Sequence, residues 1–408
     1  MKLRSLPAGV NSIASQALSS VRSLAFLVIA ARSLSPDQFG YVAIVTTATI
    51  ALNEVLRAAA SHPLALMFDD VSTDDDGPLA SAVSFHLLVA SVAGVVAAGV
   101  LLVGGPEGGS SLVAGCLVYG LVAWLDALRT GSINRGRADR SVKIDAIWTV
   151  LLLGVLPFAL ERWSSALAAV LVWGATAGLS ALATTLLCRL PVSVQSAASY
   201  WARVRDVARP LVGQVGLESV PSRLGPLAIA AIVGTQAAGS IRGAEVLMGG
   251  AAMVYSGVSA ASLRLAREQF VSDSFRSVVR SVAKQYGVVL AAVGVNLAIV
   301  LVLPERLGVA LLGESWGGAS SFAPIQALVL ASLVVFAIVS VVMRASLAMG
   351  ALVRIDLAGA VLASLLVPSA TVLGGGKVGL AMIALVALAM ALIGGRWIAR
   401  FDPFGVRV

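Results

Sequence analysis

The sequence is poor in charge, in cysteine and in histidine. Only 12% of its 408 residues are charged, against about 25% in soluble domains. Its cysteines, Cys116 and Cys188, lie in apolar segments, and its histidines, His62 and His86, have no metal-ligand residues beside them. We therefore expect no disulfide or metal site, and packing roles for the histidines. The sequence also lacks a P-loop lysine motif, a nucleophile elbow and a zinc-binding pattern, so we expect neither an enzyme nor a cofactor.

Apolar segments are abundant, because 58% of the residues are hydrophobic. Twelve stretches approach or exceed the roughly 20 residues that a helix needs to cross a bilayer, and Pro and Gly mark several of the breaks between them. An all-α polytopic membrane protein with twelve transmembrane helices is therefore predicted. The expected spans lie near 10–31, 40–67, 78–103, 111–128, 144–160, 164–188, 211–233, 238–262, 284–304, 323–343, 353–373 and 378–396.

The basic residues of the loops are distributed unevenly between the two sides of the membrane. With a cytoplasmic amino terminus, the only loop Lys and Arg residues that fall outside are Arg32, Arg162, Arg306 and Lys377. This is the asymmetry of the positive-inside rule, so both termini are predicted to be cytoplasmic. The rule also accounts for the net charge of +8, and nucleic acid is not expected as a partner.

A short internal repeat predicts two halves. Leu27 to Ala31 resembles Leu227 to Ala231, at the ends of spans 1 and 7. We predict six-helix lobes at 1–190 and 211–408, related by a pseudo-two-fold axis along the membrane normal. Between them, 191–210 carries Tyr200, Trp201 and Val204 on one side and arginines on the other. This linker is expected to be an interfacial helix, with a solvated linker as the alternative.

Four arginines lie inside apolar spans, although arginine at the centre of a bilayer costs about 2.5–3.5 kcal/mol. A water-filled cavity that receives an anion would explain them. The alternative is internal ion pairing with the glutamates of the same spans, since residues three apart share a helix face. The candidate substrate-binding residues are Arg22, Arg57, Arg223, Arg242, Glu54, Glu218 and Glu245.

The second loop is acidic. Asp69, Asp70, Asp74, Asp75 and Asp76 lie between spans 2 and 3. Such clusters bind magnesium diphosphate in membrane prenyltransferases, but those enzymes need a second acidic cluster, which the sequence does not contain. A solvated acidic turn is the favoured interpretation.

Two turn motifs and one loop resemble a known family. The segment A-A-R-S-L-S-P-D-Q-F-G-Y at 30–41 and L-L-G-E-S-W at 311–316 resemble turns of bacterial polysaccharide flippases, and 126–142 is similar to their connector between spans 4 and 5. These O-antigen and capsule transporters belong to the multidrug/oligosaccharidyl-lipid/polysaccharide exporter superfamily.

The resemblance implies a two-lobed exporter of the bacterial inner membrane with a central cavity. It would carry a polyprenyl-diphosphate-linked oligosaccharide by alternating access, with arginines of the early helices of each lobe contacting the diphosphate or acidic sugars. Coupling to H⁺, Na⁺ or the membrane potential stays open. The expected partners are the lipid-linked glycan, membrane lipids and glycan-assembly proteins such as a polymerase.

Three other functions remain possible on the sequence. A cation-coupled multidrug antiporter of the same superfamily would need an acidic cavity, whereas here arginines at least balance the glutamates. A major-facilitator transporter would carry a Gly- and Arg-rich second loop in place of the aspartates. An integral-membrane glycosyltransferase or polymerase would show acidic residues or a large loop outside.

Overall fold

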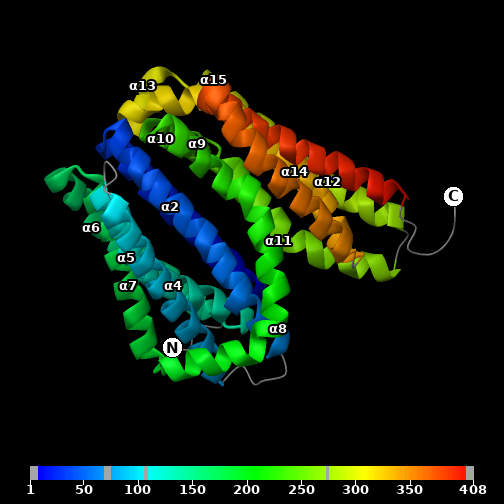
Figure 1. Ribbon diagram of the computed structural model, residues 1–408, viewed down its shortest axis with the longest axis horizontal. Coiled ribbons are helices and arrows are strands. Elements are labelled where there is room, and N and C mark those ends of the chain that lie inside the picture. The colour runs from blue at the N-terminus through cyan, green and yellow to red at the C-terminus, as the bar shows by residue number, and fades with distance from the viewer. Residues whose placement is uncertain (1–7, 69–74, 105–108, 273–274, 347, 401–408) are drawn as a thin grey trace. The chain divides into compact units, whose positions relative to one another are not determined.

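The computed structural model describes residues 8–68, 75–104, 109–272, 275–346 and 348–400. Those residues are helical apart from short turns, which confirms the all-α class. The chain divides into two compact units, Met1–Gly216 and Leu217–Val408. Figure 1 colours the first from blue to green and the second from green to red.

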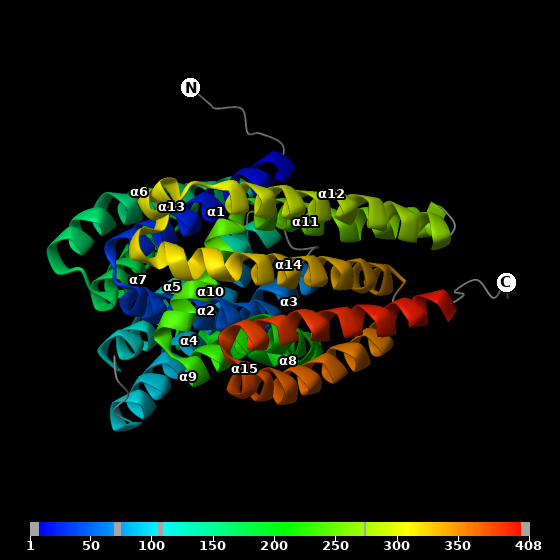
Figure 2. The ribbon, with the colours of Figure 1, turned by 90° about the horizontal axis from the view of Figure 1, so that it is seen from above.

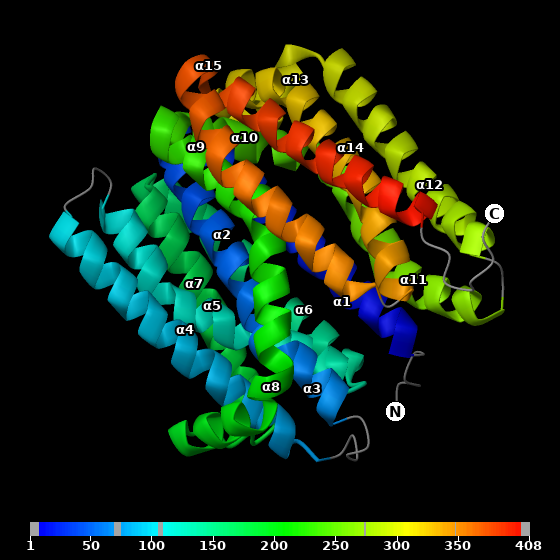
Figure 3. The ribbon, with the colours of Figure 1, turned by 45° about the vertical axis from the view of Figure 1, so that its right-hand side comes forward.

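The first unit is built around one central helix. Helix α5 packs against α2, α4, α6 and α7, and Figure 3 shows it beside α4 and α7. Polar side chains on α5 therefore have to find partners on the surrounding helices. The elements are α1 (Ala8–Ser33), α2 (Pro36–Leu56), the π turn η1 (Arg57–Ser61), α3 (His62–Met67), α4 (Gly77–Gly104), α5 (Gly109–Asn134), α6 (Ala138–Trp163), α7 (Ala166–Leu187) and α8 (Val194–Ser219), whose last residues belong to the second unit.

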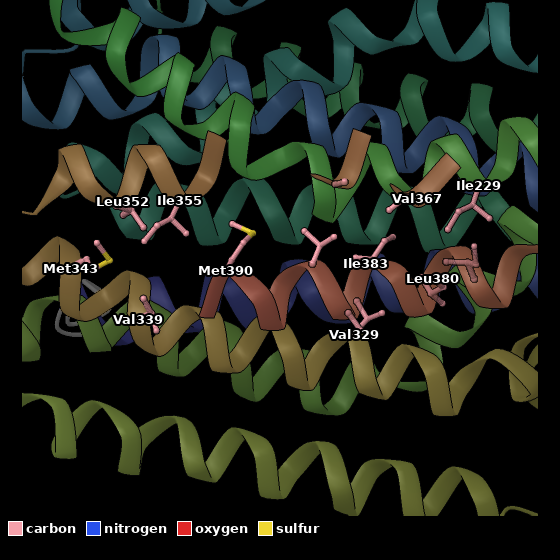
Figure 4. Packing of buried hydrophobic residues seen from close by; sticks show 14 residues of the cluster. Ile229, Val329, Val339, Met343, Leu352, Ile355, Val367, Leu380, Ile383 and Met390 are labelled. Atoms are coloured by element: carbon pink, nitrogen blue, oxygen red, sulfur yellow. The ribbon is translucent and has the colours of Figure 1, made fainter. Parts of the chain in front are cut away.

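The second unit has α14 at its centre, between α12 and α15 (Figure 2). Its largest apolar cluster joins α9, α14 and both parts of α15, with Ile229, Val329, Val367 and Ile383 among its members (Figure 4). The elements are the π turn η2 (Val220–Leu224), α9 (Gly225–Val233), α10 (Thr235–Leu247), α11 (Gly249–Ser272), α12 (Phe275–Val302), α13 (Glu305–Leu312), the 3-10 turn η3 (Gly313–Ser315), α14 (Trp316–Ala345) and α15 (Met349–Arg400).

Nine helical segments of the described chain are long and apolar enough to cross a membrane. The 52-residue α15 turns at Gly375, whose φ of 75° and ψ of −173° are not helical, so it supplies two crossings. Predicted spans 7 and 8 are not continuous α-helices. The π turn η2 interrupts span 7, and span 8 is broken between α10 and α11. Several helices exceed their predicted ends: α5 continues to Asn134, and α14 begins at Trp316.

The turn after α1 is fixed by its own side chains. Ser35 caps α2 by accepting a hydrogen bond from the Gln38 amide, and Pro36 occupies the first helical position, where a missing N–H costs nothing. The Gln38 side chain accepts from the amide of Ala166 at the start of α7 (2.8 Å), and Phe39 is fully buried. The motif at 30–41 is thus a structural corner of the first unit.

The motif at 311–316 is likewise a turn. Leu312 and Trp316 are buried, and Gly313 between them takes a φ of 58°, a conformation that favours glycine. The ring of Trp316 lies against Gly308, where a Cβ would come within 2.2 Å of it.

The acidic second loop is tied to the basic connector between α5 and α6. Asp76 pairs with Arg140 at 3.0 Å and with Arg137 at 3.2 Å. The aspartates at 69, 70 and 74 lie outside the described residues, so the interpretation of the whole cluster as a solvated turn stays a prediction.

The predicted linker lies within α8, and its apolar side is already covered. Tyr200, Val204 and Ala208 are fully buried, and Trp201 stacks on Phe85 of α4 with 5.2 Å between ring centroids. The face that the sequence assigned to the membrane surface therefore packs on the first unit instead, while Arg205 and Arg209 are exposed.

Helices α4 and α5 approach each other closely at small residues, as neighbouring membrane helices commonly do. A Cβ added at Gly94 would lie 2.2 Å from the backbone oxygen of Cys116, and one at Gly120 would lie 2.6 Å from Ser91 Oγ. These contacts also fix an antiparallel register between the two helices.

Gly94→Ala should destabilise the protein, because its methyl group must push α4 away from a backbone carbonyl. Overpacking of this kind costs about 1–3 kcal/mol. Thermal unfolding of the purified protein in detergent measures the change. Gly99→Ala in the same helix is the matched control, since a Cβ there meets nothing within 4 Å. Equal melting temperatures for the two variants would show that the close approach is wrong.

Candidate functional site

Four buried charges of the first unit form one network around α5, namely Arg22, Arg129, Asp126 and Asp145. Arg22 of α1 is 3% exposed, and its Nη1 donates to Asp145 Oδ1 of α6 at 2.7 Å. Its Nη2 donates to Ser19 Oγ at 3.0 Å, and the guanidinium lies 3.7 Å from the ring centroid of Trp148. The ion pair and the cation–π contact together compensate a charge that burial would otherwise penalise.

Asp145 is the centre of this network. Its carboxylate is fully buried and accepts from Arg22, from Arg129 Nε at 2.8 Å and from Ser15 Oγ at 2.6 Å. One aspartate thus joins α1, α5 and α6. Sequence reasoning placed Arg129 in a cytoplasmic loop, but it lies in α5 and is only 7% exposed.

The second pair of the first unit joins η1 to α5. Arg57 Nε and Nη2 donate to Oδ2 and Oδ1 of Asp126 at 2.7 and 2.5 Å, a fork-to-fork contact. Glu54, the partner that spacing suggested, adds its negative charge nearby, but the bidentate contact is to Asp126. The Arg57 side chain remains 34% exposed, against 4% for Arg22. Arg57 is therefore the more accessible guanidinium of these two pairs.

Arg57 opens a π turn, and Arg223 lies in a second one. Each turn ends just before a proline: the His62 amide donates to Arg57 O before Pro63, and the Gly225 amide donates to Val220 O before Pro226. A proline ring clashes with the carbonyl four residues earlier, and the wider turn moves that carbonyl aside. Such turns are frequent at functional sites.

Side chains from two other helices hold η1. Tyr200 of α8 donates to Ala60 O and Asn134 of α5 donates to Ser61 O, each at 2.6 Å. Burial raises the pKa of Tyr200, so its hydroxyl keeps the proton that it donates.

Three polar side chains near the Arg57–Asp126 pair have unsatisfied atoms. Within the described residues, Asn53 Oδ1, Tyr119 Oη and both ring nitrogens of His86 have no hydrogen-bond partner. Each is at most 6% exposed, and a buried polar group without a partner costs about 1–3 kcal/mol. His86 is fully buried, as its predicted packing role requires, but within the described chain that packing does not satisfy its ring nitrogens.

The second unit has two ion pairs that involve predicted residues. Arg242 and Glu245 pair within α10, as their three-residue spacing suggested. Glu218 at the end of α8 pairs with Arg344 of α14, a residue that the sequence placed in a loop. Asp356 of α15 is fully buried, and its carboxylate has no hydrogen-bond partner in the described chain.

The seven predicted residues therefore divide between the units. Arg22, Glu54 and Arg57 join one network, in which Arg129 acts on Asp126 as well as Asp145. Arg223 and Arg242 belong to η2 and α10 of the second unit. Sequence reasoning missed the roles of Asp126, Arg129, Asp145 and Arg344 because their partners lie on other helices.

Asp145→Ala should destabilise the protein strongly, because it leaves Arg22 and Arg129 buried without a carboxylate. Breaking a buried ion pair costs about 3–5 kcal/mol, which thermal unfolding in detergent would detect. Asp139→Ala on the same helix is the control: Asp139 is 53% exposed and lies 3.5 Å from Lys143, so no measurable change is expected. A small loss for Asp145→Ala would contradict the network.

Comparison with protein-family models and with curated proteins finds no match. Solved structures do match. A multidrug-resistance MATE-family transporter of the MOP superfamily in an inward-facing conformation superposes with a TM-score of 0.72 at 12% identity, over 95% of this chain and 97% of that chain. The lipid II flippase MurJ, in an inward closed conformation, gives 0.72 at 10% identity over 98% and 88%.

A MOP-superfamily transporter from Pyrococcus furiosus, described by the reversed polarity of its binding pocket, gives a TM-score of 0.60 at 12% identity over 96% of this chain and 93% of that chain. At these identities the likeness shows the fold. The prediction of twelve transmembrane helices in two bundles is confirmed. The chain has the fold of the MOP-superfamily transporters.

Proposed function

We propose that this protein is a flippase that moves a polyprenyl-diphosphate-linked oligosaccharide across the cytoplasmic membrane by alternating access. The fold is compatible with this function, since one solved structure that shares it is a lipid II flippase and another is a multidrug transporter. The choice between lipid-linked and drug-like substrates therefore depends on the residues of this chain.

Arg57 is the observation that carries the proposal. Its guanidinium lies on a membrane-spanning helix, presents its fork to a carboxylate and is still one-third exposed. Two parallel N–H donors fit two phosphate oxygens as well as two carboxylate oxygens. A diphosphate can take the place of Asp126 without a new binding geometry having to form.

The other predicted arginines take different parts in the proposal. Arg22 is enclosed by Asp145, Ser19 and Trp148, so in this conformation it holds α1 in place and offers no surface to a substrate. Arg242 and Arg223, on interrupted helices of the second unit, are proposed as further anion contacts. Glu54, Glu218 and Glu245 are proposed to tune the charge around the arginines.

The cellular setting is part of the proposal. Both termini are proposed to lie in the cytoplasm, which the distribution of basic residues in the loops supports, and a bacterial inner membrane is proposed on the family resemblance of the turn motifs. The glycan would come from membrane-bound assembly enzymes and pass to a polymerase. Transport would be coupled to an ion gradient or to the membrane potential.

Arg57→Ala should reduce flipping of a fluorescent polyprenyl-diphosphate lipid in proteoliposomes by at least tenfold, because the paired N–H donors proposed to bind the diphosphate are lost. Arg57→Lys should restore little of it, since an ammonium lacks the fork. Dithionite quenching of the labelled head group measures flipping. Arg32→Ala, an exposed arginine at the end of α1, is the control and should flip like the wild type.

Flipping at the wild-type rate by Arg57→Ala would refute the role of Arg57. Transport of organic cations by the reconstituted protein, without flipping of the diphosphate lipid, would instead identify a multidrug antiporter.

A further inference from the structure

His86 is a buried imidazole that the helix packing leaves without a partner. It lies on α4, and the contacts of Gly94 with Cys116 and of Gly120 with Ser91 fix the register of α4 against α5. Continued by about one and a half turns beyond the contact of Gly120 with Ser91, this antiparallel register places His86 beside Asp126 on α5. The side chain is 0% exposed, and neither Nδ1 nor Nε2 has a hydrogen-bond partner among the described residues.

The charges that act on His86 are those of Asp126 and Arg57. From α5, Asp126 and the hydroxyl of Tyr119 lie on one helix face, and Arg129 follows Asp126 by one turn. From α2 and η1, Glu54 and Arg57 add their charges, and from α8 the ring of Tyr200 lies against Phe85, the residue before His86. Because the Arg57–Asp126 pair is nearly neutral as a whole and burial disfavours a charged imidazole, His86 is uncharged while the pair is intact.

Binding of an anion at Arg57 changes this balance. Asp126 uses the Nε and Nη2 edge of the Arg57 guanidinium, so a phosphate that takes this edge leaves a carboxylate that is only 10% exposed without its counter-charge. A buried charge that loses its partner is strongly penalised. Protonation of the neighbouring imidazole removes the penalty, because a histidinium supplies both a positive charge and an N–H donor.

We propose that His86 is a proton-binding site linked to anion binding at Arg57. The proton enters on His86 as the guanidinium turns from Asp126 to the phosphate, and it leaves when the phosphate is released. The linkage rests on the proposed function, since it takes Arg57 as the group that binds the diphosphate.

The two histidines of the chain make the site directly observable. His62→Gln leaves His86 as the single imidazole, so isotope-labelled histidine in the full-length protein in lipid nanodiscs gives one set of ring signals. Inorganic pyrophosphate serves as the probe. At pH 7.5, saturating pyrophosphate should move the ring signals of His86 to those of the protonated form. The same signals should stay at the neutral position in His62→Gln/Arg57→Ala.

Calorimetry in buffers of different ionisation enthalpy provides a second readout. Pyrophosphate binding should take up about one proton fewer in His86→Gln than in the wild type. The affinity of the wild type for pyrophosphate should therefore fall about tenfold more per unit rise in pH than the affinity of His86→Gln does. The titration of pyrophosphate itself cancels in this difference. His62→Gln, at an exposed side chain, should take up the wild-type number.

The outcomes separate this inference from the proposed function. If pyrophosphate binds in an Arg57-dependent manner but the His86 signals and the proton count do not change, the proton site is refuted and the flippase proposal stands. If pyrophosphate does not bind, or binds equally well to Arg57→Ala, the anion site fails and the linkage fails with it.

Discussion

A charge inside a bilayer has to meet an opposite charge or water, because an isolated ion in hydrocarbon is too costly to keep. In each unit this requirement determines which helices are held together. Asp145 joins α1, α5 and α6 through Arg22 and Arg129, and Asp126 joins η1 to α5 through Arg57. In the second unit, Glu218 and Arg344 join the end of α8 to α14. Packing in lipid has no hydrophobic driving force between helices, so these ion pairs carry much of the specificity of the bundles.

The ion pairs of Arg22 and Arg57 differ in how readily the arginine could leave its aspartate for another partner. Arg22 has a carboxylate, a hydroxyl and an indole ring around it and is almost inaccessible. Removing it from Asp145 would leave buried charges on both sides. Arg57 has one partner in a bidentate contact and a third of its side chain exposed. An incoming phosphate can replace that partner with equal geometry. Under the proposed function, ion pairing and anion binding are therefore not exclusive interpretations of an intramembrane arginine, because the pair would hold the guanidinium in place until a substrate binds.

The sequence predicted the fold well and the site only in part, for a physical reason. Length and apolarity determine where a chain crosses a bilayer, so the spans, the all-α class and the twelve-helix fold followed from composition. Ion-pair partners depend on packing between helices far apart in sequence. Arg129 and Arg344 were assigned to loops because a hydropathy segment ends at a charge, although α5 and α14 continue past that point. The partnerless imidazole of His86 could not be foreseen either, since the contacts of a side chain are invisible until its neighbours are placed.

Two prolines in the sequence indicate where the π turns lie, although the sequence analysis did not use them. His62-Pro63 and Gly225-Pro226 each follow a π turn that carries one of the four intramembrane arginines. A widened turn rotates the side chains that precede it relative to a regular helix, so an arginine can leave the packed face without the helix ending. The turn motifs at 30–41 and 311–316 act differently, because their residues cap helices and fill corners. Resemblance in such corners therefore reports on the fold, whereas the π turns determine how the two arginines are presented, which is the feature that the proposed function uses. Among the four arginines, position in the helix therefore separates Arg57 and Arg223, which lie in π turns, from the buried Arg22, which lies within a regular helix.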